Sequence, residues 1–343
     1  MTPILCPTCL VLLAEGVTSW DCPGCGVSYR SLRGIPDLRV ADDGYLPNAE
    51  DWSLALALDA AYDDLDFLGL LSLLLDLGPP LKPELKARQI NHILTAGPRA
   101  RAWVEAIGAG SGAWLDLGCG SGSFLASRAA EGTDLVGIDV AMRWLLVARK
   151  RLDEEGALAR SSRLVCGNAE RLPFADQTFA AVIAGDVIEH VASQRDTLAE
   201  SYRVLIPGGR CILATPNRTS LAPEPHVGLW GVGFLPRAWM GRYVAARGRG
   251  DFRAILTRTA GGWLRLLAAS PFRGGTLRAP RLTESDLAAM PGLKRRLGRA
   301  YNAAVSTRVG RAIALRVGPL LHLVATRPDA TPTPPPSTTP SGG

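Results

Sequence analysis

Long hydrophobic runs and lysine are both scarce in this sequence. The longest apolar run, Phe67–Leu77, is interrupted by Asp76, and it is shorter than the roughly 20 residues that a membrane-spanning helix requires. No signal peptide pattern precedes it, so we expect no stable membrane insertion. Only four of the 38 basic side chains are lysine. A general bias towards arginine therefore explains part of the charge pattern.

Acidic residues are scarce in one half of the chain. Residues 210–328 contain four acidic and 20 basic side chains, whereas residues 1–209 contain 27 acidic and 18 basic ones. A basic segment of this kind attracts phosphate-rich substrates, nucleic acid or an anionic membrane surface. The charge pattern therefore leaves an anionic partner as one alternative and a simple arginine bias as the other.

Cysteines number seven, an odd total that argues against a framework of disulfides. Three of them, Cys119, Cys166 and Cys211, stand alone in the sequence. This usage is typical of a reducing compartment, so we expect a cytoplasmic protein.

The other four cysteines form two C-x2-C pairs. Cys6 and Cys9 are separated by twelve residues from Cys22 and Cys25. Two turns that each carry a pair of thiolates can converge on one tetrahedral zinc ion, with every ligand position filled by sulfur. A redox-active C-x-x-C is the alternative, but it normally lies within a strand–helix pattern that is missing here. We predict a structural zinc site.

A glycine-rich turn follows a short apolar run at residues 113–117. Gly118, Gly120 and Gly122 alternate with other residues, and a helical pattern follows them. Glycines allow a sharp turn and a close approach of the backbone to a ligand, and the start of a helix offers free N–H groups. The stretch predicts a strand, a turn and a helix at a binding site.

A second predicted strand ends in Asp139, 21 residues after Gly118, where a carboxylate can accept hydrogen bonds from ribose hydroxyls. The glycine pattern is G-x-G-x-G and not the G-x-G-x-x-G of dinucleotide sites. The acid that precedes it, Asp116, suits a cationic ligand end better than a pyrophosphate. We therefore favour a nucleoside cofactor that carries an amino acid over NAD.

Strands and helices alternate beyond Asp139, which predicts a doubly wound, mostly parallel sheet of the α/β class. Residues 113–217 resemble class I S-adenosylmethionine (SAM) dependent methyltransferases, most closely the ubiquinone-biosynthesis-like branch. The motifs that carry the resemblance are the glycine turn, Asp139, the segments 165–174 and 185–191, and the Pro-Gly-Gly turn at 207–209. The resemblance implies a seven-stranded Rossmann-like sheet. It also implies that SAM is the cofactor.

The resemblance assigns a role to individual residues. Asp116 and the glycines would hold the methionine end of SAM, Asp139 the ribose and Asn168 the adenine, although the family usually has an aspartate where Asn168 stands. The expected cofactor-binding residues are Asp116, Gly118, Cys119, Gly120, Gly122, Asp139, Val140, Asn168, Ala169 and Asp186.

The chain divides by composition and motif into four parts. Residues 1–40 are expected to form a zinc ribbon, 41–107 a linker and helical segment, 108–328 the methyltransferase domain, and 329–343 a disordered Pro/Thr/Ser-rich tail. Within the domain, residues 217–258 are expected to form an insertion or lid on the substrate side.

His190 and Glu189 are the catalytic candidates, because both lie on the predicted loop beside the methyl donor. A purely structural role for this pair is the alternative. Some relatives carry a divalent ion such as Mg²⁺ at the corresponding acid and Glu-His pair, here Asp186, Glu189 and His190.

Three functions follow from this reading of the sequence. The first is a methyltransferase that acts on a small-molecule or lipid-like acceptor. The second is an RNA methyltransferase that uses the ribbon and the basic C-terminal half for docking. The third is a SAM-binding or interaction module without turnover. The sequence does not indicate the acceptor or the oligomeric state.

Overall fold

A computed structural model describes residues 2–16, 18–42, 44–108, 110–128, 133–156, 162–248 and 252–329. The tail predicted to be disordered lies outside these residues, apart from Asp329.

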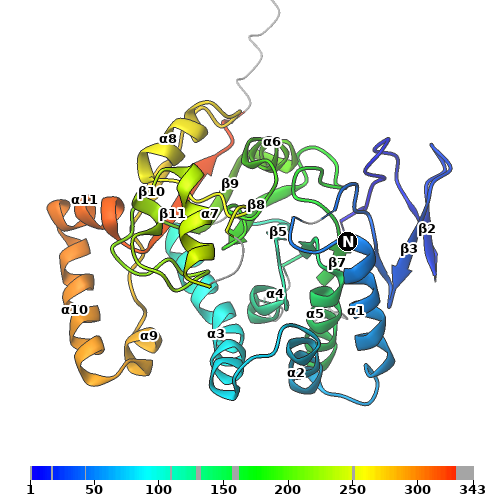
Figure 1. The fold of residues 1–343 in the computed structure, drawn as a ribbon. Coiled ribbons are helices and arrows are strands. Elements are labelled where there is room, and N and C mark those ends of the chain that lie inside the picture. The colour runs from blue at the N-terminus through cyan, green and yellow to red at the C-terminus, as the bar shows by residue number, and fades with distance from the viewer. Residues whose placement is uncertain are drawn as a thin grey trace, which may run out of the picture.

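A seven-stranded sheet forms the centre of the protein (Figure 1). Its strand order is β10-β11-β9-β8-β5-β6-β7, and the five strands from β9 to β7 run parallel to one another. The strand bounds are Trp114–Leu117 for β5, Leu135–Asp139 for β6, Ser162–Cys166 for β7, Phe179–Gly185 for β8, Leu205–Pro216 for β9, Thr276–Arg278 for β10 and Leu320–Thr326 for β11.

The direction of winding reverses between β5 and β8. The chain moves outward through β6 and β7 on one side of β5, then returns to the other side with β8 and β9. β11 inserts antiparallel between β9 and β10. The predicted doubly wound, mostly parallel sheet is therefore confirmed, and the reversal leaves a crevice at the carboxyl ends of the strands.

Helices cover both faces of the sheet. Figure 1 shows α6 and α8 above it and α2, α3, α4 and α5 below it. The helix bounds are Asn48–Ala60 for α1, Phe67–Leu77 for α2, Pro83–Ile107 for α3, Ser123–Arg128 for α4, Met142–Glu154 for α5, Gln194–Val204 for α6 and Ala260–Ala268 for α8.

The strands are apolar on both sides because helices bury both faces. In β8 the first six residues are all buried. Ile183 belongs to the cluster that includes Leu145 of α5, whereas Val182 belongs to the cluster that includes Leu198 of α6 and Trp263 of α8. The period of two along a strand thus supplies one core on each face.

Two elements begin at positions that have a local explanation. β9 begins at Leu205, because the Pro-Gly-Gly segment remains in the strand beside a register shift near Phe179. α3 begins at Pro83, where proline occupies the first turn and no N–H bond is lost.

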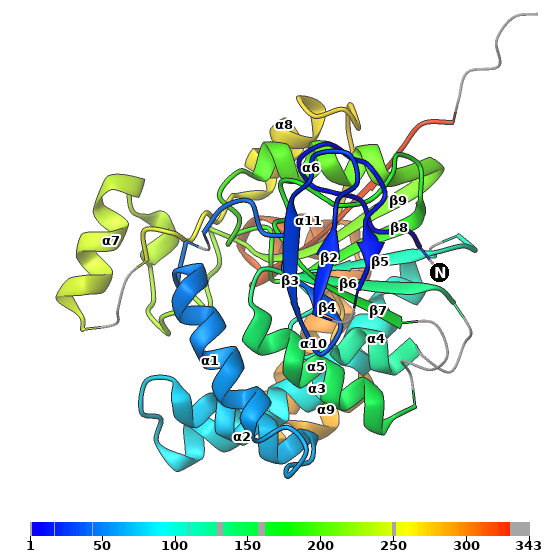
Figure 2. The ribbon, with the colours of Figure 1, turned by 90° about the vertical axis from the view of Figure 1, so that its right-hand side faces the viewer.

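The N-terminal region forms a separate small antiparallel sheet, seen face-on in Figure 2. It pairs with the large sheet at one edge, through a parallel bridge from Asp37 to Cys166 at the end of β7. The amide of Leu38 donates to the carbonyl of Cys166 at 2.8 Å. The strands are β1 (Ala14–Glu15), β2 (Ser19–Asp21), β3 (Ser28–Leu32) and β4 (Ile35–Pro36).

Two helical insertions extend the fold. Residues between β9 and α8 contain the short helix η2 (Val232–Phe234) and α7 (Arg237–Ala246), which share a small apolar cluster of their own. Antiparallel neighbours β10 and β11 are joined by α9 (Glu284–Ala289), α10 (Gly292–Ser306) and α11 (Arg308–Val317). Among the residues described, no helix has the length and apolar character needed to span a bilayer.

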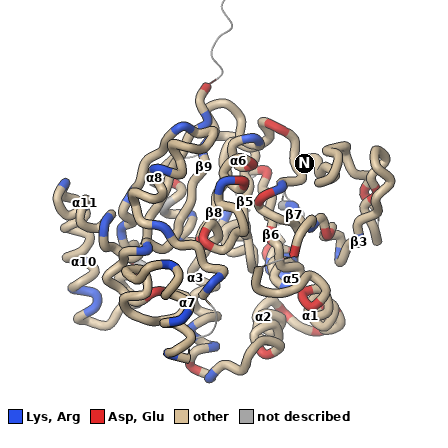
Figure 3. The backbone as a smooth tube through the Cα atoms, turned by 45° about the horizontal axis from the view of Figure 1, so that its top comes forward, with Lys and Arg blue, Asp and Glu red and all other residues tan. Residues whose placement is uncertain are grey.

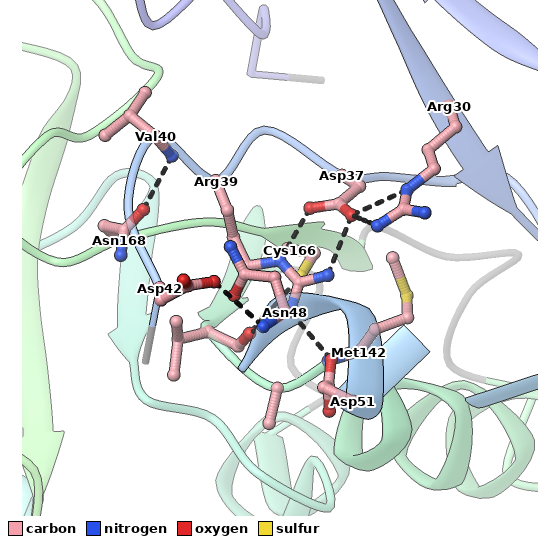
Figure 4. A network of polar contacts seen from close by, with 12 residues as sticks. Arg30, Asp37, Arg39, Val40, Asp42, Asn48, Asp51, Met142, Cys166 and Asn168 are labelled. Carbon is pink, nitrogen blue, oxygen red and sulfur yellow. Dashed lines mark hydrogen bonds and ion pairs between the residues drawn. The ribbon is translucent and has the colours of Figure 1, made fainter. Parts of the chain in front are cut away.

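A buried ion network connects the small sheet to the large one (Figure 4). The Arg39 side chain is 1% exposed and contacts Asp37 at 2.7 Å and Asp51 of α1 at 2.7 Å. It also donates to the carbonyl of Val140 at 3.1 Å. Asp51 in turn accepts from the amide of Met142 at 2.9 Å, which caps the start of α5. One guanidinium therefore connects three separate segments.

We predict that Arg39→Leu lowers the free energy of unfolding by about 3 kcal/mol, because Asp37 and Asp51 lose their one fully buried counter-charge and keep only the more exposed Arg30 and Arg143. Arg30→Leu is the matched control, since Arg30 contacts the same Asp37 from a side chain that is 48% exposed. That control should cost no more than about 1 kcal/mol. Urea unfolding measures both changes, and equal losses in the two variants would contradict the assignment.

Candidate functional site

A cavity of about 1970 Å³ opens at the carboxyl ends of the parallel strands. Its walls come from the glycine turn after β5, the ends of β6 and β8, the linker around Tyr45, helix α3 and the segment around Pro280. Ligands of doubly wound sheets bind at this edge, where the winding reverses. Tertiary structure thus places the predicted cofactor residues, apart from Gly122, at one cavity.

The glycine turn requires glycine for two different reasons. Gly118 has a φ of +73°, and a Cβ there would lie 2.3 Å from a methyl carbon of Val187. Gly120 has a φ of +48°, but no heavy atom lies within 4 Å of its Cβ position. The first glycine permits close packing, and the second leaves open space beside the cavity.

Asp139 is held at the end of β6 by two backbone donors. Its carboxylate accepts from Gly120 N at 2.9 Å and from Ala141 N at 2.9 Å. Burial raises the pKa of Asp139, whereas the two N–H donors oppose that change. Each oxygen keeps a lone pair for a further donor, which fits hydroxyl groups of a ligand.

Asp116 lies on the cavity wall with its side chain buried. Burial, with a smaller contribution from the charge of Asp139, raises the pKa of Asp116 to about 7. Within the described part of the chain its carboxylate has no hydrogen-bond partner. A cationic group of a ligand would stabilise its ionised form.

Asn168 binds another part of the chain with its side-chain amide. Its Oδ1 accepts from Val40 N at 2.8 Å and from Ala41 N at 3.3 Å, and its Nδ2 donates to Ala41 O at 3.2 Å. Figure 4 shows the contact to Val40. We call residues 39–42 and 44–45 the strap. The amide predicted to meet adenine holds the strap against the cavity, and the adenine role stays a prediction.

All the other predicted cofactor residues except Gly122 also lie on the cavity wall. Asp186 has a φ of +55°, and burial raises its pKa. The residues that line the cavity include Cys119, Val140, Ala169 and Asp186, together with Gly118 and Gly120. Gly122 packs against Ala148 of α5 behind the turn.

A chain of hydrogen bonds runs through His190 at the rim. Its Nδ1 lies 2.5 Å from the hydroxyl of Tyr45 in the strap, and its Nε2 lies 3.1 Å from Nε2 of His226. His226 Nδ1 lies 2.5 Å from Glu224 Oε1. Burial and the neighbouring His226 lower the pKa of His190 to about 4. His190 is thus held by partners from two distant segments.

Glu189 lies behind His190 and is fully buried. Its Oε2 accepts from the hydroxyl of Thr215 on β9 at 3.0 Å. Burial, followed by the charge of Asp186, raises the pKa of Glu189 to about 8. The predicted catalytic pair therefore has one member at the cavity and one in the interior.

The four cysteines predicted to bind zinc converge in the small sheet. All four sulfur atoms lie within 4.8 Å of one another. Sγ atoms of Cys6 and Cys25 are 3.7 Å apart, and those of Cys9 and Cys22 are 3.3 Å apart. Thiolates bound at about 2.3 Å to one tetrahedral zinc lie about 3.8 Å apart. These separations fit a zinc ion and exclude a disulfide bond, whose length is about 2.05 Å.

Two equivalent turns present the sulfur atoms. Leu10 N donates to Cys6 O at 2.8 Å in the first turn, and Gly26 N donates to Cys22 O at 2.9 Å in the second. Leu10 and Gly26 both have positive φ values, 58° and 74°. The same backbone geometry is therefore built twice, once with glycine and once with a strained leucine.

The cysteine turns contact the loop after β7. Arg171 donates through its guanidinium to the carbonyl oxygens of Pro7 and Thr8. Leu5 N donates to Pro173 O at 2.8 Å. The small sheet is thus anchored to the loop that carries Asn168, because Arg171 follows Asn168 by only three residues in the sequence.

Sequence reasoning missed Arg39, Tyr45 and His226. Arg39 lies at the end of the stretch expected to form the ribbon, Tyr45 lies in the expected linker, and His226 lies in an insertion without a motif. The available signals were an aromatic residue in a turn-rich linker and one of only four histidines, next to Glu224.

Comparison with known proteins agrees with this geometry. The family described as "Methyltransferase domain" matches residues 115–213. A demethylmenaquinone methyltransferase of Thermobifida fusca is 32% identical over 180 residues, which are 51% of this chain and 73% of that protein. A ubiquinone/menaquinone biosynthesis C-methyltransferase of Desulfotalea psychrophila is 38% identical over 129 residues, which are 36% of this chain and 50% of that protein.

Another relative is a ubiquinone biosynthesis O-methyltransferase of Azorhizobium caulinodans, 37% identical over 105 residues, which are 31% of this chain and 40% of that protein. The chain thus spans about half the length of these two biosynthetic relatives from Desulfotalea and Azorhizobium. Among solved structures, a geranyl diphosphate C-methyltransferase of Streptomyces coelicolor A3(2) is similar with a TM-score of 0.46 and 20% identity, over 73% of this chain and 86% of that chain.

We predict that Asn168→Ala frees the strap, because three hydrogen bonds to Val40 and Ala41 are lost. At about 1 kcal/mol each, this loss should speed amide exchange in residues 40–45 at least tenfold. Hydrogen exchange with mass spectrometry measures the change. Asn217→Ala is the control: its amide donates to Leu315 and Arg316 carbonyls, so exchange should rise there and not in the strap. Unchanged exchange in the strap of Asn168→Ala would refute this role.

Proposed function

This chain belongs to the class I methyltransferases that use SAM, and from that premise we propose that it transfers a methyl group from SAM to a small lipid-like acceptor. The observation that carries the proposal is the cavity, in which Asp116, a buried carboxylate without a hydrogen-bond partner among the described residues, lies near the ribose-type acid Asp139. Bound SAM would supply a methyl group on a positively charged sulfur.

The chain's own residues would bind and orient the cofactor. Asp139 would accept from the ribose hydroxyls, while Asp116 would meet the positive charge of the methionine end. Asn168 would act through the strap, which it holds over the cavity, and the backbone beside Ala169 would face the adenine. Methyl transfer is an in-line displacement, so this alignment is the main requirement.

The cavity is larger than SAM alone requires. Drug-sized ligands occupy pockets of about 300 to 1000 Å³, and this cavity has about 1970 Å³. The wall formed by residues 278–301 carries Ala279, Pro280, Leu282, Met290 and Tyr301, interleaved with the polar residues Arg278, Arg281, Thr283 and Asp286. Apolar surface predominates in the cavity as a whole, which supports an acceptor with a hydrophobic body.

Helices α10 and α11 favour a lipid surface over RNA as the neighbouring partner. Leu293, Leu297, Val309 and Ile313 are between 56% and 74% exposed on these helices. Residues 287–328 contain no acidic side chain, and Figure 3 shows only basic colour on α10 and α11. Exposed aliphatic side chains among arginines suit an anionic membrane surface, whereas RNA would be met by polar and aromatic groups.

His190 is the side chain best placed to orient the acceptor or to take its proton, because it lies at the cavity and the buried Glu189 does not. A magnesium ion held by Asp186, Glu189 and His190 does not fit. The donor atoms that converge belong to Glu189, His190 and His226, and two imidazoles are a poor match for a hard ion. We therefore assign no step to magnesium.

The four cysteines would hold one structural zinc ion, and the ribbon would act inward on the cofactor site. Arg171 connects the cysteine turn to the loop that carries Asn168, and β4 leads directly into the strap. This arrangement makes the ribbon a support for the cavity and leaves RNA docking without a structural argument.

We predict that SAM binds in preference to NADH and that Asp139→Ala weakens SAM binding about ten- to a hundredfold. The lost bonds between a carboxylate and the ribose hydroxyls contribute roughly 1.5 to 3 kcal/mol. Isothermal titration calorimetry measures both ligands. Equal affinity for NADH, or unchanged SAM affinity in a folded variant, would contradict the cofactor assignment.

Transfer of tritiated methyl from SAM into separate RNA, lipid and small-molecule fractions tests the reaction itself. We expect label in the lipid or small-molecule fraction. Label confined to RNA would favour the docking alternative, and SAM binding without label would identify a non-catalytic module.

We predict that mercurial modification of thiols releases one zinc ion per chain. Cys22→Ser should lose that ion. It should also bind SAM more weakly, because without the ion the first cysteine turn, to whose carbonyls Arg171 donates, is no longer held in place. Cys211→Ala is the control, since Cys211 is a buried cysteine of β9 far from the pairs in sequence, and this variant should retain the ion. Two disulfides and no thiolate-bound metal in freshly reduced protein would end this idea.

A further inference from the structure

The second histidine of the rim comes from the insertion between β9 and α8. Both imidazoles have their Nδ1 atoms engaged on the outside: His226 with Glu224 at 2.5 Å and His190 with Tyr45 at 2.5 Å. Their Nε2 atoms therefore face each other, 3.1 Å apart. Outer partners on Nδ1 are the usual way in which proteins aim the other nitrogen of a histidine at a metal ion.

Glu189 supplies an unpartnered oxygen at the same point. Among the residues described, its Oε1 is buried and accepts no hydrogen bond, although its Oε2 is paired with Thr215. His226 Nε2 lies 3.9 Å from this oxygen. A buried carboxylate oxygen without a donor is costly unless another ligand satisfies it.

We propose that Glu189, His190 and His226 bind a divalent first-row transition ion such as zinc. The three donor atoms lie within 4.8 Å of one another. Atoms bound to one ion at about 2.1 Å lie about 2.9 to 3.5 Å apart, so the two nitrogens are already in range and Glu189 needs only a small approach.

A hydrogen bond between the two imidazoles explains their separation but leaves Oε1 of Glu189 without a partner. A bound ion accounts for all three atoms. Two nitrogen donors and one carboxylate are typical of zinc and of iron sites with open positions, and not of magnesium. The disagreement with the hard ion expected at Asp186 follows from His226, which the chain brings in from 36 residues away.

The ion would have two consequences. His190 lines the cavity, so open coordination positions would face an acceptor group there. His226 belongs to the insertion and Glu189 to the loop after β8, so the ion would also hold the insertion against the cavity. His190 would then act through the ion and not as a free base.

Metal analysis of the full-length chain after dialysis against zinc tests the site. We expect two ions per chain in the wild type and in His92→Ala, the control histidine on α3. Glu189→Gln and His226→Ala should contain one ion, the thiolate-bound ion of the ribbon, whose retention shows that the variant is folded. One ion in the wild type, or two in His226→Ala, would overturn the proposal.

Glu224→Gln tests the outer partner without removing a ligand. Loss of the Glu224 carboxylate should weaken cobalt binding at this site about ten- to a hundredfold. If the two histidines only form hydrogen bonds and bind no ion, cobalt should not bind here at all. The site depends on donor geometry and not on methyl transfer. SAM affinity measured in the same variants therefore separates failure of the metal site from failure of the proposed function.

Discussion

The contacts of the buried Arg39 guanidinium hold together the segments beside the cavity. The guanidinium lies between Asp37, which leaves the small sheet, and Asp51, which caps α5, and it also contacts the carbonyl of Val140 beside Asp139. Although burial favours the neutral acid, Arg39 and Arg30 hold the pKa of Asp37 below its ordinary value. Burying these charges is costly, and the pairing of Arg39 with both carboxylates offsets that cost, together with Arg30 on Asp37 and Arg143 on Asp51.

From this anchor the strap crosses the open edge of the large sheet. Asn168 holds its first half, and Tyr45 in its second half contacts His190. The small sheet with its four cysteines, the cavity and His190 are therefore linked through one short segment. The N-terminal small sheet is thus connected through this segment to the loop after β8.

The C-terminal helices complete the cavity from the other side. β10 and β11 are adjacent and antiparallel, so a short turn could join them, yet α9, α10 and α11 intervene. The segment leading into α9 supplies a wall of apolar and basic side chains, and α10 and α11 expose aliphatic and basic side chains. The proposed acceptor and the proposed membrane surface thus depend on the same insertion.

The sequence by itself determined the parts whose signals are local. The glycine turn, Asp139 and the two cysteine pairs are short motifs, and the alternation of strands and helices follows from residue periodicity, so the doubly wound sheet was predictable. The roles suggested for Asn168 and for the Asp186–Glu189–His190 set were drawn from spacing and family resemblance, which carry no information about partners elsewhere in the chain.

Tertiary structure alone decided those partners. Asn168 meets Val40 across 128 residues, His190 meets Tyr45 across 145, and His226 reaches His190 from an insertion that has no periodic signal. A side-chain amide or imidazole binds whichever group the fold brings within about 3 Å, and that distance is set by packing of whole elements. For this reason the sequence predicted the ligand-binding edge of the sheet with its glycine turn and Asp139. It did not predict the contacts of the strap or the pairing of His190 with His226.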